Sequence, residues 1–356
     1  MKIGLIGLAG AGKSTLLRLL TQGQAGGPGK ARIGAAPVPD VRVDALSRLF
    51  RPKRTVYAQV ECTELPDFQL QSASGGAAAR ELAEALRPID CVVVVVRAFA
   101  APHVPHPLGE PDPWRDVQAV FDELMLMDWT LVETRLERLV EARKKGVRRD
   151  DEIRLFERLR PELEAGRPLR AVALSDDEAA LLKPYSFVTT RPAVLAVNVD
   201  EAQLRAQDYP GRDQVHAWAA ERDIPVVELA ALIEAEIEEL PEEERAAFLE
   251  DLGLTEPGIA RLARSAYHAL DLISFFTVGS DEVRAWTVRR GATAREAAGV
   301  IHSDMERGFI RAEVAEYQDL LREGSLHALK EKGLLRLEGK DYLVRDGEVI
   351  HFRFNV

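Results

Sequence analysis

The sequence predicts an α/β fold: a doubly wound domain with a parallel sheet, an inserted antiparallel helical hairpin, and a smaller C-terminal domain. Short apolar runs rich in β-branched residues alternate with helical patterns over most of the chain. A long segment dense in Leu, Glu and Arg interrupts this alternation, and the pattern changes again from about Phe275. Runs that are apolar at consecutive positions are typical of parallel strands that helices cover on both faces.

Composition limits the possible functions. The chain has 356 residues, which at ~150 residues per domain predicts two or three domains. Its formal net charge of −11 argues against a surface that coats nucleic acid, so contact with RNA would need a local basic patch. Cys62 and Cys91 lack the spacing of a zinc site or a disulfide framework. No apolar run is long enough to cross a membrane, and we expect a cytoplasmic protein without a membrane partner.

The first domain is expected to comprise residues 1–113 and 190–275. Its predicted strands are the apolar runs Ile3–Ile6, Val92–Val96, Val194–Val197 and Pro225–Val227. Helical patterns lie between them, among them Ser14–Leu20 and Ala77–Leu86. The alternation of strands with helices indicates a doubly wound sheet.

The inserted segment 114–189 is predicted to form the hairpin. Apolar residues recur at near-helical spacing in two arms: Val117, Phe121, Leu124, Leu131, Leu136 and Leu139, then Ile153, Phe156, Leu159 and Leu163. Between the arms a glycine is flanked by five cations, Arg143, Lys144, Lys145, Arg148 and Arg149. These cations are candidates for phosphate contacts with ribosomal RNA; the alternative is that they form only the solvated turn of a hairpin.

The C-terminal segment 276–356 is expected to be a separate small domain. Val283–Val288 has the pattern of a strand and Ala294–Met305 that of a helix. Tyr342–Val344 and Val349–Phe354 are predicted to pair as a hairpin, because the Asp-Gly pair between them favours a tight turn.

The segment Gly7–Ser14 fits the pattern GxxxxGK[ST], and it follows a predicted strand and opens a predicted helix. Backbone N–H groups of such a loop surround phosphates, aided by the positive end of the helix dipole. Lys13 would reach the β- and γ-phosphates, and the Ser14 hydroxyl would ligate Mg²⁺. The expected nucleotide contacts here are Gly10, Ala11, Gly12, Lys13, Ser14 and Thr15. The strand–loop–helix context disfavours the alternative of a glycine-rich turn that binds nothing.

Several other short segments of the chain match the motifs of one known family. They are Pro37–Asp40, Val96–Phe99, Asn198–Glu201, Ile233–Ile237, Phe248–Leu254, Val283–Thr287, Gly308–Val314 and His351–Val356. Together they resemble the YchF/Obg-like ATPases, of the translation-factor class of P-loop proteins. The resemblance implies a nucleotide domain, an inserted helical hairpin, and a C-terminal TGS domain with a ubiquitin-like β-grasp fold. It also implies a ribosome- or translation-associated partner that contacts the hairpin and the C-terminal domain.

The choice of base is expected to rest on the segment after the third predicted strand. In GTPases an Asn-Lys-x-Asp motif stands here, and its aspartate accepts two hydrogen bonds from guanine. This chain has Asn198 and, in the fourth position, Glu201, whose longer side chain loses or strains that pair. By resemblance, these residues imply ATP and ADP in preference to GTP and GDP, with Val199 lining the base. Ala231 and Leu232 align with a loop on the base side.

The residues for hydrolysis depart from the family pattern. By resemblance, His106 takes the place of the glutamine that orients water in Ras-like GTPases, and His103 is a weaker candidate. Glu64 and Asp67 align with the ends of an Asp-x-x-Gly motif, so Glu64 would serve the metal through a water. Asp67 would bring a carboxylate to the γ-phosphate; at ~4 Å and an effective dielectric constant of ~20 this costs on the order of 4 kcal/mol. The segment 22–36 is shorter than in relatives and has no Ser or Thr to complete the Mg²⁺ shell.

Two functional hypotheses follow. The first is a P-loop nucleotidase that binds adenine nucleotide with Mg²⁺ and hydrolyses ATP slowly through water attack on the γ-phosphate. The second is a degenerate paralogue that binds nucleotide as a structural or regulatory ligand without significant hydrolysis, which the altered Asp67 and the 22–36 segment favour. An RNA-binding scaffold with an empty phosphate loop is disfavoured by the context of the loop.

Overall fold

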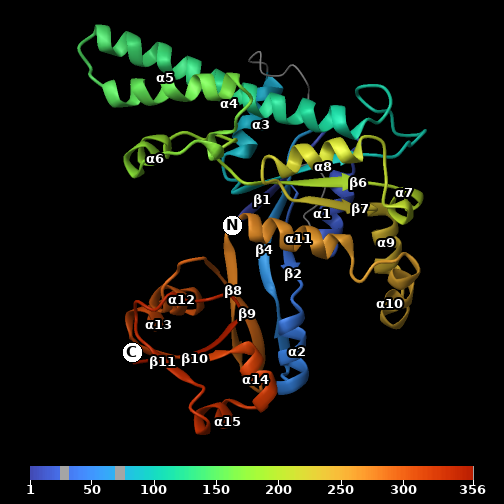
Figure 1. The fold of residues 1–356 in the computed structure, drawn as a ribbon, viewed down its shortest axis with the longest axis vertical. Coiled ribbons are helices and arrows are strands. Elements are labelled where there is room, and N and C mark those ends of the chain that lie inside the picture. Colours follow the sequence, from blue (N-terminus) through green and yellow to red (C-terminus); the bar gives the residue numbers. More distant parts are fainter. Residues whose placement is uncertain (25–31, 69–76, 356) are drawn as a thin grey trace. The chain divides into compact units, whose positions relative to one another are not determined.

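The computed structural model describes residues 1–24, 32–68 and 77–355 and confirms the predicted α/β fold class (Figure 1). These residues form two compact units. Unit 1 comprises Met1–Gly34 and Glu61–Leu262, and unit 2 comprises Ala35–Val60 and Ala263–Val356. None of the helices in the described ranges has both the length and the apolar character needed to cross a membrane.

In the described residues, the first sheet has six strands in the order β2-β4-β1-β5-β6-β7. They are β1 (Lys2–Ile6), β2 (Ile33–Val38), β4 (Ala58–Glu64), β5 (Cys91–Arg97), β6 (Ala193–Asn198) and β7 (Val226–Leu229). Strands β4, β1, β5, β6 and β7 run parallel to one another. Parallel strands place their carboxyl ends at one edge of the sheet, so the residues that follow these strands converge there.

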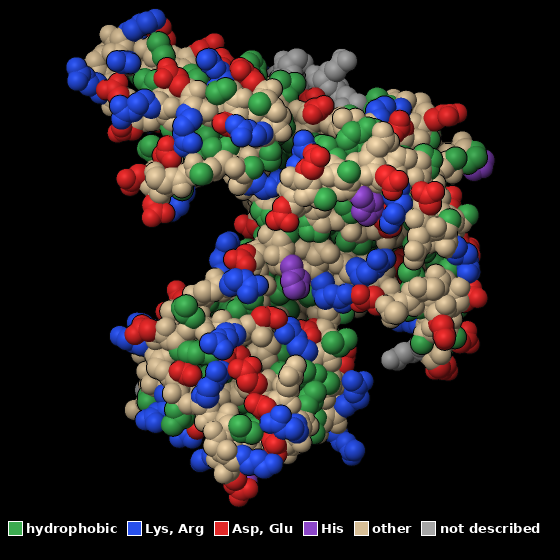
Figure 2. All heavy atoms as spheres, viewed as in Figure 1, with side chains coloured by type: hydrophobic (Ala, Val, Ile, Leu, Met, Phe, Trp, Pro, Cys, Tyr) green, Lys and Arg blue, Asp and Glu red, His purple; other side chains and the backbone are tan. Residues whose placement is uncertain are grey.

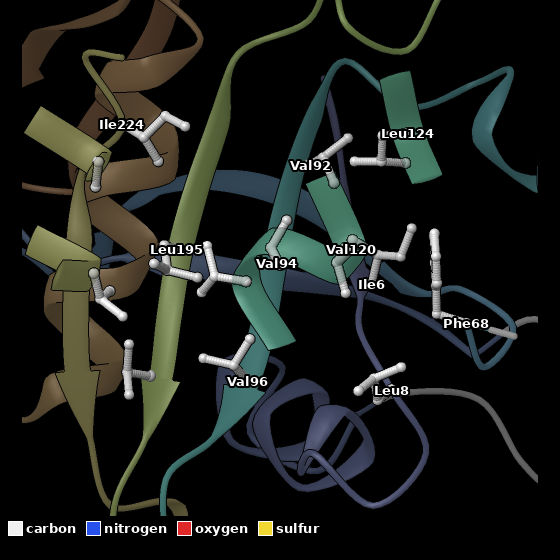
Figure 3. Close-up of a cluster of buried hydrophobic side chains, with 14 of the residues drawn as sticks. Ile6, Leu8, Phe68, Val92, Val94, Val96, Val120, Leu124, Leu195 and Ile224 are labelled. Atoms are coloured by element: carbon white, nitrogen blue, oxygen red, sulfur yellow. The ribbon is translucent and has the colours of Figure 1, made fainter. Parts of the chain in front are cut away.

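The two central strands are buried on both faces. All seven residues of β5 and all six residues of β6 are buried, as their consecutive apolar positions predict. On one face, Val92 and Val94 of β5 belong to the same apolar cluster as Val120 and Leu124 of helix α4 (Pro113–Lys144) (Figure 3). The run of valines is therefore core, and it fixes the position of Arg97, which ends the strand.

The other helices of unit 1 follow its strands in the chain. They are α1 (Lys13–Leu20), α3 (Ala77–Leu86), α7 (Glu201–Ala206), α8 (Arg212–Ala220), α9 (Ala231–Glu239), α10 (Glu242–Asp251) and α11 (Gly258–Ala269), the last of which runs on into unit 2. One glutamate of the acidic α9 is buried: Glu234 accepts hydrogen bonds from the N–H groups of Gly258 (2.5 Å) and Ile259 (3.2 Å). It thereby satisfies backbone donors at the start of α11, which no helical hydrogen bond can reach.

The predicted hairpin is formed by α4 and α5 (Asp150–Glu164). α4 is 32 residues long, and α5 packs against it through an apolar cluster that includes Leu136, Phe156 and Leu159. After α5 the chain passes through a 3₁₀ turn, Leu169–Ala171, and helix α6 (Asp176–Leu182) before it enters β6. The apolar spacing of both arms in the sequence is explained by this shared core.

A buried carboxylate, that of Asp128, ties the middle of α4 to the chain that returns from the hairpin. It accepts hydrogen bonds from the backbone N–H groups of Val188 (2.9 Å) and Thr189 (2.7 Å) and from the Thr189 hydroxyl (2.6 Å). Burial raises the pKa of Asp128 to about 6, although these hydrogen bonds act in the opposite direction. A buried group of three hydrogen bonds to Asp128 therefore helps to hold the base of the hairpin.

Unit 2 contains a second sheet, whose strand order in the described residues is β11-β10-β12-β8-β9-β3. The strands are β3 (Arg54–Val56), β8 (Leu272–Val278), β9 (Glu282–Arg289), β10 (Phe309–Glu316), β11 (Arg336–Glu338) and β12 (Glu348–Phe354). Its helices are α2 (Val41–Phe50), α12 (Ala294–Ile301), α13 (Ser303–Arg307), α14 (Tyr317–Glu323) and α15 (Leu326–Glu331). β12 pairs in parallel with β8 and antiparallel with β10, and alanines of α12 pack into the core cluster of this mixed sheet.

The predicted hairpin between Tyr342–Val344 and Val349–Phe354 is wrong. Leu343 forms an isolated bridge with Thr293, while β12 pairs with β10 and β8. The Asp-Gly pair is bound to β8 instead: the Asp346 carboxylate accepts the Ser274 N–H (2.9 Å), and the Gly347 N–H donates to the Ser274 carbonyl (2.7 Å). The turn residues Asp346 and Gly347 therefore bind the backbone of β8 at Ser274.

The predicted single helix Ala294–Met305 is divided into α12 and α13. The division falls at His302, whose backbone is extended (φ −160°). The ring Nδ1 of His302 accepts a hydrogen bond from the N–H of Asp304 (3.2 Å) and so caps the second helix. A histidine inside an apolar helical pattern gave no signal of this break.

The two units divide the chain differently from the expected boundaries. Ala35–Val60, expected in the first domain, belongs to unit 2. The reason is that β3 pairs in parallel with β9, and that Arg42 of α2 forms an ion pair with Asp346 (2.7 Å). Neither contact leaves a pattern in the sequence between residues 35 and 60.

Replacement of Asp128 by alanine should destabilise unit 1. It would leave three buried donors without an acceptor, and we expect the free energy of unfolding to fall by about 3 kcal/mol. Urea denaturation followed by circular dichroism measures this change. Asp122→Ala, the same substitution at an exposed position of α4, is the matched control. Equal stability of the two variants would show that Asp128 does not hold the hairpin.

Candidate functional site

The loop Gly7–Ser14 joins β1 to α1, as its pattern predicts. Gly12 precedes the helix with a left-handed backbone (φ +103°), and a Cβ atom there would lie 2.4 Å from Nδ2 of Asn198. A Cβ atom on Gly7 would lie 2.2 Å from the carbonyl oxygen of Val95. Both glycines are therefore required by close approach of the neighbouring strands' ends.

Lys13 lies folded back over this loop and is 4% exposed. Its ammonium group donates to the carbonyl oxygens of Gly7 (2.9 Å) and Leu8 (3.1 Å) and to Oδ1 of Asp67 (2.7 Å). An ammonium group has three N–H donors, so all three are used. Two of its bonds hold the lysine in the loop, and the third is made to a carboxylate from another segment.

That carboxylate belongs to the segment that follows β4, which is fixed in place by its backbone. The N–H of Leu65 donates to the Leu5 carbonyl (3.0 Å), and that of Phe68 donates to the Gly7 carbonyl (3.2 Å). The side chains of Leu65 and Phe68 are each 3% exposed within the core of unit 1. The side chain of Asp67, between them, is 59% exposed and reaches Lys13 at the mouth of the loop.

Glu64, at the end of β4, faces the other functional side chain of the loop. Its Oε1 accepts the Ser14 hydroxyl at 2.5 Å, and its Oε2 lies 3.6 Å from the Arg32 guanidinium. The two residues predicted to serve a metal, Ser14 and Glu64, are thus in direct contact. Thr15, the next residue after Ser14, is half-buried in the first turn of α1.

Asn198 connects the phosphate loop to the loop after β7. Its Nδ2 donates to the Ala11 carbonyl (3.0 Å), and its Oδ1 accepts the Ala231 N–H (3.0 Å). Asn198 is 3% exposed, so both bonds are shielded from water. The structure therefore brings together three predicted site residues, Ala11, Asn198 and Ala231.

The other residues predicted on the base side lie in different surroundings. Val199 is buried in the apolar core of unit 1, whereas Leu232 is 66% exposed. Glu201 begins α7 and pairs with Arg205 (2.9 Å), with half of its side chain exposed. Contact of these three residues with a base stays a prediction.

His106 is held by helix α4. Its Nε2 lies 2.9 Å from Oδ2 of Asp116, its Nδ1 accepts the Leu108 N–H (3.2 Å), and its side chain is 3% exposed. The pKa of His106 is lowered, because the effect of burial outweighs that of the neighbouring Asp116 carboxylate, which acts to raise it. Because Nδ1 accepts the Leu108 N–H, a neutral imidazole carries its proton on Nε2, the atom that lies near Asp116. The catalytic role of His106 stays a prediction, and His103 lies exposed in the same loop.

Comparison with known proteins places this chain in a family. A family model described as YchF-GTPase_C, a protein of unknown function (DUF933), matches residues 272–355. The chain is 39% identical over 362 residues to the ribosome-binding ATPase YchF of Haemophilus ducreyi, with 100% of this chain and 99% of that protein covered. It is 38% identical over 363 residues to the ribosome-binding ATPase YchF of Bacillus subtilis, with 99% of each covered. The chain belongs to the YchF family.

A solved structure of the YchF family supports the same assignment. The YchF GTPase of Schizosaccharomyces pombe aligns with a TM-score of 0.85 at 29% identity and covers 99% of this chain and 97% of that chain. The likeness extends over both units, so the resemblance expected from the sequence strings is confirmed. It gives unit 1 the P-loop fold that the Gly7–Ser14 pattern indicates.

Two arginines in contact with the candidate site were missed by sequence reasoning. Arg97 is 2% exposed, and its Nη1 donates to the carbonyls of Val104 (3.1 Å) and Gly10 (3.4 Å). It thereby joins the phosphate loop to the segment that carries His106, and burial lowers its pKa. A cation that ends a buried strand was a usable signal for Arg97. No pattern in the sequence indicated the contact of Arg32 with Glu64.

Replacement of Asn198 by alanine should loosen the phosphate loop. The Ala11 carbonyl and the Ala231 N–H would both be left unpaired, so we expect a loss of about 2 kcal/mol in the free energy of unfolding. Urea titration measures it, with Gln214→Ala, the loss of an exposed amide on α8, as the control. If both variants unfold at the same urea concentration, Asn198 is not a structural link.

Proposed function

We propose that the chain is a nucleotide-binding P-loop protein that takes ATP or ADP with Mg²⁺, hydrolyses ATP slowly, and associates with ribosomes in the cytoplasm. The observation that carries the proposal is the buried ammonium group of Lys13, held by two carbonyls of its own loop with its third donor at the mouth. Such a lysine, beside the backbone N–H groups of the loop and the start of α1, recognises phosphate.

The donor set at Ser14 and Glu64 fits Mg²⁺. Both present hard oxygen donors, and their oxygens are 2.5 Å apart. Among the described residues, no group of three or more His, Cys, Asp or Glu side chains forms a cation site. Mg²⁺ commonly uses one or two protein oxygens and completes its shell with phosphates and waters. When bound, the ion would neutralise charge on the phosphate oxygens.

The preference for adenine over guanine is supported by the sequence at the base side. Guanine would need the aspartate of Asn-Lys-x-Asp, and this chain has Glu201 in that position. Asn198 does not replace it, because both ends of its amide are occupied by Ala11 and Ala231. ATP and ADP therefore suit this site better than GTP and GDP.

In the proposed reaction, water attacks the γ-phosphate while Lys13 and the loop N–H groups stabilise the developing charge. His106 would orient the water once it leaves Asp116. The alternative, a member that binds nucleotide as a regulatory ligand without significant hydrolysis, is favoured by the two carboxylate contacts, of Asp67 with Lys13 and of Asp116 with His106. Single-turnover hydrolysis of ATP, with and without ribosomes, decides between the two.

Association with ribosomes is supported by the names of the relatives and by the charge at the tip of the hairpin. Both curated relatives described above are called ribosome-binding ATPases. The exposed tip carries the cations Arg143, Lys144, Lys145, Arg148 and Arg149, and Figure 2 shows Lys and Arg side chains gathered at this end of the hairpin. The C-terminal domain is a second proposed contact. Phosphates of ribosomal RNA are the chemistry that such a tip would recognise.

Lys13→Ala tests the nucleotide site. It removes a charge-assisted bond to phosphate, so we expect the affinity for ADP and ATP to fall by about 100-fold. Isothermal titration calorimetry in Mg²⁺ measures the affinities. Lys183→Ala, which removes an exposed lysine beyond α6, is the control. Unchanged binding by Lys13→Ala would refute the proposed function.

Charge reversal tests the tip. The double variant Lys145→Glu, Arg148→Glu should weaken co-sedimentation with ribosomes by about tenfold at moderate salt, because phosphate contacts become repulsive. The control, Arg154→Glu with Arg160→Glu, makes the same change in net charge on exposed positions of α5. If both double variants weaken binding equally, the tip has no special role.

A further inference from the structure

We propose that Asp67 is a specificity determinant of the nucleotide site, and that its carboxylate makes the site favour nucleoside diphosphates over triphosphates. The inference rests on the nucleotide binding proposed above and adds that the site distinguishes diphosphates from triphosphates. It follows from three features of the structure: the bonds of Lys13, the fixed position of the segment around Asp67, and the second carboxylate beside it.

The first feature is that Asp67 uses the donor of Lys13 that a phosphate would need. Lys13 donates two N–H groups to Gly7 and Leu8, which keep the ammonium group within the loop. Its remaining donor points to the mouth of the loop and is bound to Asp67 at 2.7 Å. A phosphate oxygen can take this bond only if it displaces the carboxylate or shares the donor with it.

The second feature is that Asp67 cannot readily leave the phosphate loop. Leu65 and Phe68, on either side of it, are buried in the core, and their N–H groups are bonded to the carbonyls of Leu5 and Gly7. The Gly7 carbonyl also accepts a bond from Lys13, so the segment and the lysine share an anchor. Side-chain rotation can break the contact with Lys13, but the carboxylate stays close to any phosphate bound there.

The third feature is the charge balance at the mouth of the loop. Glu64 adds a second carboxylate at Ser14, and Arg32 lies 3.6 Å from it on the other side. With Mg²⁺ bound, Glu64 would face a cation. By its alignment with the last position of the Asp-x-x-Gly motif and its contact with Lys13, Asp67 would instead face the terminal phosphoryl group of a triphosphate. A diphosphate has one phosphoryl group and one negative charge fewer, so its β-phosphate can share the third Lys13 donor with Asp67 while no γ-phosphate meets the carboxylate.

The expected discrimination is moderate. Because 59% of the Asp67 side chain is exposed, solvent screens its repulsion of a phosphate. We therefore expect ADP to bind about tenfold more tightly than a triphosphate, well below what a buried pair of like charges at contact distance would produce.

Calorimetric titration of the full chain with ADP and with a non-hydrolysable ATP analogue, both in Mg²⁺, tests the proposal. In the wild type, ADP should bind about tenfold more tightly than the analogue. Asp67→Asn should tighten binding of the analogue by about tenfold and change binding of ADP by less than about threefold. Asp67→Glu keeps the charge and should keep the preference for ADP. Glu84→Gln, an equal change of charge at an exposed position of α3, should leave both affinities unchanged.

The outcomes separate this proposal from the one on which it rests. If the wild type and Asp67→Asn bind both nucleotides with the same ratio of affinities, Asp67 does not set the preference, while nucleotide binding stands. If Glu84→Gln shifts the ratio as much as Asp67→Asn does, the effect is one of net charge and the proposal is overturned. If neither nucleotide binds to any of the proteins, the proposed function itself fails.

Discussion

Parallel pairing of five strands is the constraint on which the candidate site depends. Because β4, β1, β5, β6 and β7 run in the same direction, their carboxyl ends meet at one edge of the sheet. Each end supplies a different part: the phosphate loop after β1, Glu64 at the end of β4 with Asp67 just beyond it, Arg97 on β5, Asn198 on β6, and Ala231 after β7. The burial of β5 and β6 on both faces fixes their ends, so the hydrophobic core indirectly positions Arg97 and Asn198.

Much of this fold could be predicted from the sequence because its signals are local. Consecutive apolar positions mark the central strands, and apolar spacing marks both arms of the hairpin. Two of the errors fall where contacts are distant in sequence. The Asp-Gly pair before β12 is bound to Ser274 of β8, and Ala35–Val60 joins unit 2 through β9 and Asp346. Short motifs do not encode such pairings, and only the folded chain shows which partner a turn residue takes.

For the site, the sequence identified the right kinds of residue but not their partners. The pattern GxxxxGK[ST] located Lys13 and Ser14, and the alignment of Glu64 and Asp67 placed carboxylates nearby. It did not show that these carboxylates are in contact with Lys13 and Ser14 themselves. Nor did it show that both atoms of the Asn198 amide are used for backbone contacts. Side-chain partners depend on the position of each strand end, which a one-residue change of register would alter.

The three side chains on which hydrolysis would depend share one physical state: each is engaged by a carboxylate of the chain itself. Lys13 is bound to Asp67, Ser14 to Glu64, and His106 lies against Asp116. For these three side chains, slow hydrolysis or none is therefore a question of whether each exchanges its carboxylate partner for nucleotide, metal or water. In the proposed function Glu64 would remain useful after exchange, because a carboxylate beside Ser14 can hold Mg²⁺ through a water. Asp67 has no such second use, since it meets a phosphate as a like charge. Asp116 differs again, because it lies on α4, so release of His106 depends on a helix whose other end carries the basic tip.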